Sequence, residues 1–98
     1  MAHSDTIAAA IDRIMQMEAR FDRLQEIYDT LPPEALREPE AQTLLQTLRG
    51  YYFDGEWMAD YAMDEAGEFP KNMKRGVLSE DGLYHLLCDV MDALDALE

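Results

Sequence analysis

Residues 57–87, WMADYAMDEAGEFPKNMKRGVLSEDGLYHLL, decide the fold, because regular helical spacing breaks off here and resumes only near the end of the stretch. An acidic and aromatic segment opens it and stops at Gly67, a residue suited to the left-handed end of a helix. The loop that follows contains Pro70 and Gly76 and alternates apolar with basic side chains. A loop so rich in apolar residues is expected to pack against the core. Ser79 is expected to cap the next helix.

Outside this stretch, apolar residues recur every three or four positions, which is typical of amphipathic helices. We predict an all-α fold: an antiparallel bundle of three main helices plus one short helix, with the packed irregular loop before the last helix. One helical domain is expected over residues 1–98. The expected helices lie near 6–31, 39–53, 56–66 and 79–97.

The first helix carries an a/d heptad pattern over almost four heptads. Its apolar positions are Ile7, Ala10, Ile14, Met17, Phe21, Leu24, Tyr28 and Leu31. Such a face packs inside one chain or pairs two chains, so a homodimer through the first helix is the alternative to an intramolecular bundle. Ser4 or Asp5 is expected to cap this helix, and Arg13 and Glu18 are expected on its solvent side.

The composition is strongly acidic, with 21 acidic and 8 basic residues and a formal charge of −13. Residues 51–98 hold 12 of the acidic side chains and only three basic ones, Lys71, Lys74 and Arg75. This charge argues against direct binding to nucleic acid or to an anionic membrane. No apolar run is long enough to span a membrane, no leader is recognised, and Cys88 is the only cysteine. A cytoplasmic location is therefore expected.

The same central stretch contains the candidate binding surface. It combines aromatic, acidic and basic side chains: Trp57, Asp60, Tyr61, Asp64, Glu65, Lys74, Arg75 and Tyr84. In the structural interpretation, the loop folds back and Lys74 or Arg75 neutralises Asp60 or Asp64, with Arg75 the better partner because its planar fork matches a carboxylate. In the functional interpretation, the Trp57–Arg75 surface binds a protein or peptide, since Trp, Tyr and Arg dominate interface hot spots.

Three other functions are weighed against this one. Asp60, Asp64 and Glu65 could hold a cation in a metal-binding protein or an enzyme, although the aspartate spacing of a calcium loop is absent. The acidic surplus could mimic nucleic acid and occupy a basic DNA-binding protein. His85 and Cys88 are neighbours on the last helix, but no feature activates the thiol. We therefore expect a non-enzymatic protein-interaction module, with no cofactor and no metal.

Between Glu56 and Leu87 the chain reads EW-x2-DY-x2-DEAG-x2-P-x3-KRGVLSED-x2-Y-x-LL. This pattern, which covers about a third of the chain, resembles the small bacterial domain-of-unknown-function family 4298. The resemblance implies a small α-helical fold and carries no activity with it. The break at residues 31–33 departs from the more continuous helices of that family.

Overall fold

The computed structural model describes residues 2–79 and 81–98, with side chains from Thr6 onward. These residues form helices and connecting loops and contain no strand, which confirms the all-α prediction. The elements in chain order are α1 (Ala2–Thr30), η1 (Pro33–Arg37), α2 (Pro39–Phe53), α3 (Glu56–Glu65), η2 (Gly76–Leu78) and α4 (Gly82–Ala96), where η marks a short 3₁₀ helix.

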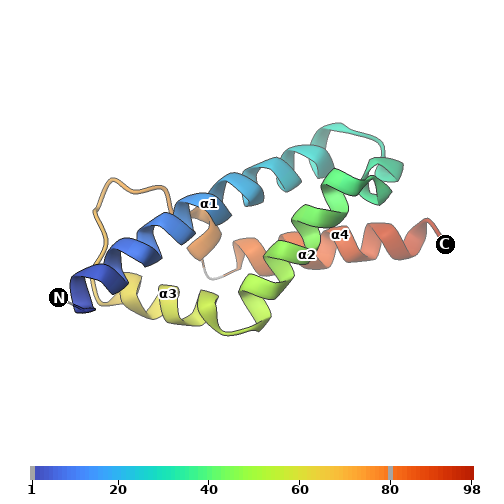
Figure 1. Ribbon diagram of the computed structural model, residues 1–98. Coiled ribbons are helices and arrows are strands. Elements are labelled where there is room, and N and C mark those ends of the chain that lie inside the picture. The colour runs from blue at the N-terminus through green and yellow to red at the C-terminus, as the bar shows by residue number, and fades with distance from the viewer. Residues whose placement is uncertain (1, 80) are drawn as a thin grey trace.

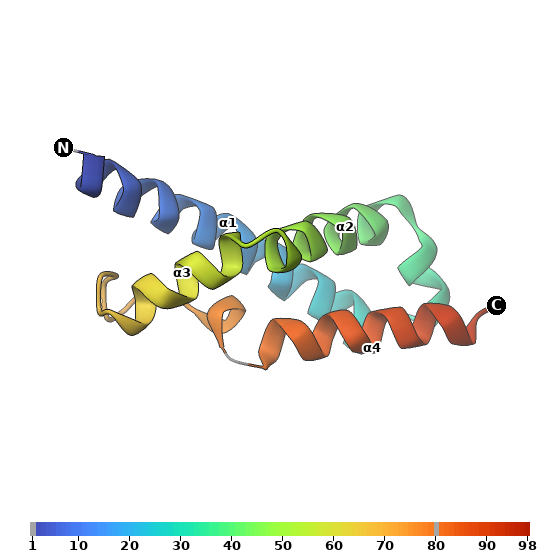
Figure 2. The ribbon, with the colours of Figure 1, turned by 90° about the horizontal axis from the view of Figure 1, so that it is seen from below.

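The three long helices lie along an elongated molecule of 49 × 24 × 21 Å. α2 runs antiparallel to α1 and to α4, so the chain follows the long axis three times (Figure 1). α3 continues from the end of α2 after a bend at Gly55, where φ is 101° and a side chain would be strained. Figure 2 shows η2 beside α3 and the start of α4. The segment that decides the fold therefore closes one end of the bundle.

One cluster of buried apolar side chains forms the core, and every helix and both 3₁₀ helices contribute to it. Its larger members include Ile14, Leu24, Leu36, Leu48, Trp57, Val77, Leu78, Leu83, Leu86, Leu87 and Val90. Phe69, from the loop between α3 and η2, is buried with them. The loop therefore packs down on the core, as its apolar content predicts.

Helix boundaries differ from the prediction at two starts. α1 begins at Ala2, so Ser4 and Asp5 lie within the helix and do not precede it as caps. α4 begins at Gly82, three residues later than expected, although the Ser79 hydroxyl still accepts a hydrogen bond from the Gly82 N–H at 3.1 Å. Glu80, which falls within the expected helix 79–97, lies outside the described residues.

The buried face of α1 is not the uniform heptad face that the spacing predicts. Tyr28 and Leu31 are exposed, whereas Ile27 and Glu18 are buried. The reason is that α1 has different neighbours along its length, since its middle packs on η2 and its last turns pack on η1 and α2. The face that meets the core therefore rotates around the helix, which one constant repeat does not capture.

Candidate functional site

Asp60 is the most enclosed charged residue of the predicted surface, with none of its side chain exposed. Of the predicted alternatives, in which Lys74 or Arg75 neutralises Asp60 or Asp64, those at Asp60 are not formed, because the partner of Asp60 comes from α1. The Arg13 guanidinium donates from Nε to Asp60 Oδ2 at 3.0 Å and from Nη2 to Oδ1 at 2.5 Å. The Tyr51 hydroxyl donates to the same Oδ2 at 2.7 Å. A buried carboxylate needs such partners, so these three side chains tie α1, α2 and α3 together.

These contacts shift the pKa of both partners of Asp60. The hydrogen bond to Asp60 raises the pKa of Arg13, so the guanidinium stays charged. Burial, followed by the hydrogen bond to the carboxylate, raises the pKa of the Tyr51 hydroxyl well above its ordinary value. Tyr51 is therefore held as a neutral donor.

Arg75 pairs with Asp64, which is the pairing that the fork geometry of arginine predicts. Its Nη1 lies 2.5 Å from Asp64 Oδ1. The same guanidinium donates to the backbone carbonyls of Met73, at 3.2 Å, and of Pro70. Arg75 thus holds the irregular loop closed on itself and against α3.

Lys74 points away from the carboxylates of α3, so its predicted role there is wrong. Its Nζ lies 2.9 Å from Asp22 Oδ2 on α1, and this hydrogen bond raises the pKa of Lys74. Glu65 is exposed and lies in no ion pair among the described residues. The predicted cluster therefore does not form one group. Asp60 is buried with Arg13, Asp64 pairs with Arg75, and Lys74 and Glu65 lie apart from both pairs.

Two side chains hold the backbone of Val77 in η2. The Trp57 indole N–H donates to the Val77 carbonyl at 2.8 Å, and the Glu18 carboxylate accepts the Val77 N–H at 2.9 Å. A Cβ added at Gly76 would lie 3.1 Å from Glu18 Oε2 and would crowd the carboxylate. We call this arrangement the Val77 clamp. The clamp contradicts the expectation that Glu18 faces solvent. The only feature of the sequence that could have indicated the burial of Glu18 is its position next to the apolar Met17.

Five rings form a continuous aromatic row across α2, α3 and α4. Centroid distances are 5.1 Å for Tyr61–Trp57, 5.0 Å for Trp57–Tyr52 and 6.0 Å for Tyr52–Tyr84, and Phe53 meets Tyr52 edge-on at 5.1 Å. The row is buried at Trp57 and reaches solvent at its ends. Tyr52 and Phe53, both within the expected helix 39–53, were not among the predicted site residues, and the spacing of Tyr52 indicates only the apolar face of that helix.

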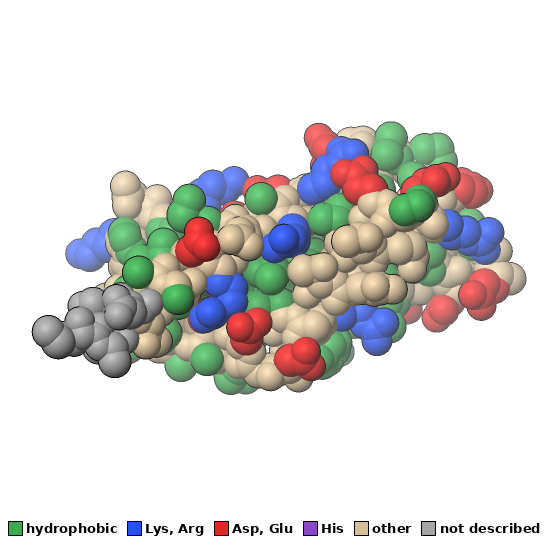
Figure 3. Space-filling model, in the orientation of Figure 1, with side chains coloured by type: hydrophobic (Ala, Val, Ile, Leu, Met, Phe, Trp, Pro, Cys, Tyr) green, Lys and Arg blue, Asp and Glu red, His purple; other side chains and the backbone are tan. Residues whose placement is uncertain are grey.

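The exposed end of the row includes Phe53 and Tyr84, with Met58 on the adjacent helix α3. Their exposed fractions are 63%, 45% and 62%. A hydrogen bond with Cys88, one turn along α4, raises the pKa of the Tyr84 hydroxyl. Figure 3 shows hydrophobic side chains beside acidic groups along the edge formed by α3 and its connection to α2. We call Phe53, Met58 and Tyr84 the aromatic shelf.

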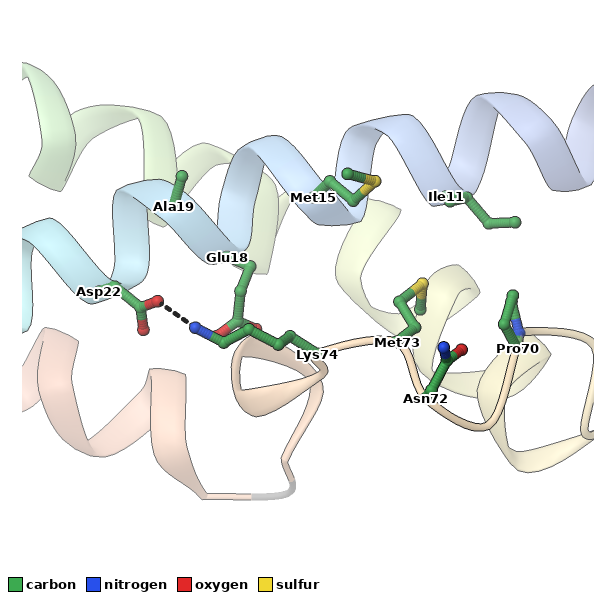
Figure 4. Close-up of a pocket in the computed structure, with 9 residues that line it drawn as sticks. All are labelled: Ile11, Met15, Glu18, Ala19, Asp22, Pro70, Asn72, Met73 and Lys74. Atoms are coloured by element: carbon green, nitrogen blue, oxygen red, sulfur yellow. Dashed lines mark hydrogen bonds and ion pairs between the residues drawn. The ribbon is translucent and has the colours of Figure 1, made fainter.

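A separate groove of about 500 Å³ lies between α1 and the loop before η2. Its walls are mainly apolar, with Ile11 and Met15 on one side and Pro70 and Met73 on the other (Figure 4). The Lys74–Asp22 pair described above marks one end of it.

The carboxylates proposed for metal binding or acid–base chemistry do not converge. Asp60 and Asp64 are each engaged by an arginine, and Glu65 is exposed. Among the residues that the structure describes, no group of three or more His, Cys, Asp or Glu side chains is arranged to hold a metal ion. None of the described helices has the length and apolarity required to cross a membrane.

These features define a class: a small all-α protein in which an irregular loop is clamped between two helices beneath an aromatic row. Within this class, the chain belongs to the family described as Domain of unknown function (DUF4298), whose model matches residues 9–97. No curated protein and no solved structure matches the chain.

Proposed function

We propose that the protein is a non-enzymatic protein-interaction module whose contact face is the aromatic shelf, at the exposed side of the Trp57–Arg75 surface. The observation that carries this proposal is the exposure of Phe53 and Tyr84, whose rings both contact Tyr52 at one end of the aromatic row, together with the exposure of Met58 on α3. Aromatic residues and methionine are enriched at protein interfaces, and rigid rings lose little entropy on binding.

The predicted site residues divide into two roles under this proposal. Trp57 contacts Tyr52, whose ring in turn contacts Phe53 and Tyr84 of the shelf. Asp60, Asp64 and Arg75 hold together the elements that carry the shelf. Tyr84 contacts the partner directly. Tyr61 and Glu65 lie on the far side of Trp57 and extend the contact face along α3.

A capture experiment with matched variants tests the proposal. The whole chain is immobilised, and proteins captured from a native lysate are quantified for the parent and for Phe53→Ser and Tyr84→Ser. The controls are Leu31→Ser and Tyr28→Ser, because Leu31 and Tyr28 are similarly large, 45% and 37% exposed, and located at the other end of the bundle.

We expect the two shelf variants to lose proteins that both controls retain, with all four melting within a few degrees of the parent. Equal capture by shelf variants and controls would contradict the proposal. Trp57→Ala is unsuitable for this test, because Trp57 is buried and holds Val77, so the variant would lose the fold together with the surface.

A further inference from the structure

We infer that the partner presents a cationic segment to the aromatic shelf, in which arginine side chains accompany apolar ones. This inference rests on the proposed function and adds the chemistry of the partner. Three exposed acids lie within one turn of a ring of the aromatic row along the chain: Asp54 directly follows Phe53, Asp81 precedes Tyr84, and Glu65 follows Tyr61. We call these three acids the acidic rim.

Three cations around the central stretch pair with acids outside the rim, while Lys71 is exposed and forms no ion pair among the described residues. Arg13 binds Asp60, Arg75 binds Asp64 and Lys74 binds Asp22. No lysine or arginine of the described residues forms an ion pair with a member of the rim.

Arg49 is the cation that lies closest to the shelf in sequence, one turn before Phe53 on α2. It is exposed and lines the groove between α2 and α4, which also contains Arg37, Asp95 and Glu98. No ion pair joins Arg49 to the rim among the described residues, so the three carboxylates are left to the cations of a partner.

Arginine matches this surface better than other side chains do. Its planar guanidinium stacks on the face of an aromatic ring and donates two parallel hydrogen bonds to a carboxylate. The Tyr52 and Tyr84 rings are stacked at 24° and 6.0 Å, and Asp81 lies one turn away from Tyr84. An ammonium is more strongly hydrated and lacks the planar fork, so lysine should bind more weakly. Leucine or methionine in the same segment would cover Phe53 and Met58.

The probe is a short synthetic peptide in which arginine and leucine residues are separated by serine and glycine. Binding to the whole protein is measured by calorimetry and by the fluorescence of Trp57, which contacts two tyrosines of the row. Matched peptides replace every arginine by lysine or by glutamine. We expect the lysine peptide to bind several-fold more weakly and the glutamine peptide roughly tenfold or more weakly.

A matched-charge control separates local recognition from the general attraction of a cation to a chain of charge −13. Asp54→Asn with Asp81→Asn neutralises two acids of the rim. Asp29→Asn with Glu34→Gln neutralises two acids at the far end of the bundle. We expect only the first pair to weaken binding of the arginine peptide, by roughly fivefold or more.

Two results would overturn the inference. Equal weakening by both double variants would assign the binding to net charge, as the nucleic-acid-mimic alternative predicts. Equal binding of the glutamine and arginine peptides would show that the positive charge of the peptide does not contribute to binding. The proposed function fails separately, through the capture experiment, if Phe53→Ser and Tyr84→Ser capture the same proteins as their controls.

Discussion

Asp60 shows how a buried charge links helices that are distant in sequence. Its partners Arg13 and Tyr51 lie 47 and 9 residues away. The sequence indicated that the carboxylates of α3 need cations, and both Asp60 and Asp64 pair with an arginine, but only the partner of Asp64 was predicted. It could not indicate Arg13, because the charged positions on one turn of a long helix look alike until the neighbouring helix is placed. The buried pair was therefore missed, and the more exposed one was found.

Removing Arg13 should be far more costly than removing an exposed arginine of the same helix. Arg13→Ala leaves the Asp60 carboxylate buried without its cation, which should lower the free energy of unfolding by about 3 kcal/mol. This value lies at the low end for such changes, because the Arg13 side chain is 28% exposed. Arg23→Ala removes solvent-exposed pairs with Glu26 and Glu40 and should change stability little. Urea unfolding of both variants measures the contrast, and equal losses would contradict it.

Tyr51 should make the protein less stable in alkali. Its pKa is raised in the fold, so above about pH 10 the unfolded chain releases the phenolic proton while the folded chain keeps it. The free energy of unfolding should therefore fall with pH, by about 1.4 kcal/mol per unit for this one group.

Tyr51→Phe should remove that part of the slope and lower stability at neutral pH, since Asp60 Oδ2 loses a donor. Tyr28→Phe, at an exposed position, is the control. Urea unfolding at a series of pH values compares the two variants with the parent. An unchanged slope in Tyr51→Phe would show that Tyr51 does not keep its proton.

At the scale of elements, the helices were easier to predict than their contacts. Pro39 and the Asp54–Gly55 turn delimit α2, and the observed helix is Pro39–Phe53. The packing of the loop before η2 also followed from its apolar residues. The Val77 clamp did not, because Glu18 lies 59 residues before the backbone N–H that it accepts. Spacing within one segment carries no information about which distant segment will face it.

Two glycines should respond to alanine in opposite directions. Gly50 lies inside α2, where a Cβ would meet only Asp54 Oδ2, at 3.6 Å, so Gly50→Ala should stabilise the protein by roughly 0.5–1 kcal/mol. Gly76→Ala would press against the carboxylate of Glu18 at 3.1 Å and strain the Val77 clamp, so it should destabilise. Thermal unfolding decides both signs, and a stabilising Gly76→Ala would show that the clamp yields easily.

At the scale of the whole molecule, the heptad face of α1 is largely used within the chain. Ala10, Ile14 and Leu24 are fully buried against other elements. A coiled-coil dimer through that face would have to dismantle the core. We therefore expect light scattering at low micromolar concentration to give the mass of one chain. Twice that mass would indicate a dimer through another surface. The outer side of α1, where Met15 is 60% exposed beside the groove, would then be the surface to test.

The Val77 clamp limits how far the KRGVLSED segment can be transplanted. Its shape depends on a carboxylate from α1 and an indole from α3, neither of which lies within the segment itself. The isolated peptide, or the same eight residues inserted into an unrelated protein, should not adopt the conformation that the Val77 clamp holds. A host protein would have to supply both a carboxylate and an indole N–H at the positions of Glu18 and Trp57. The sequence signature therefore depends on contacts among three separate parts of the chain.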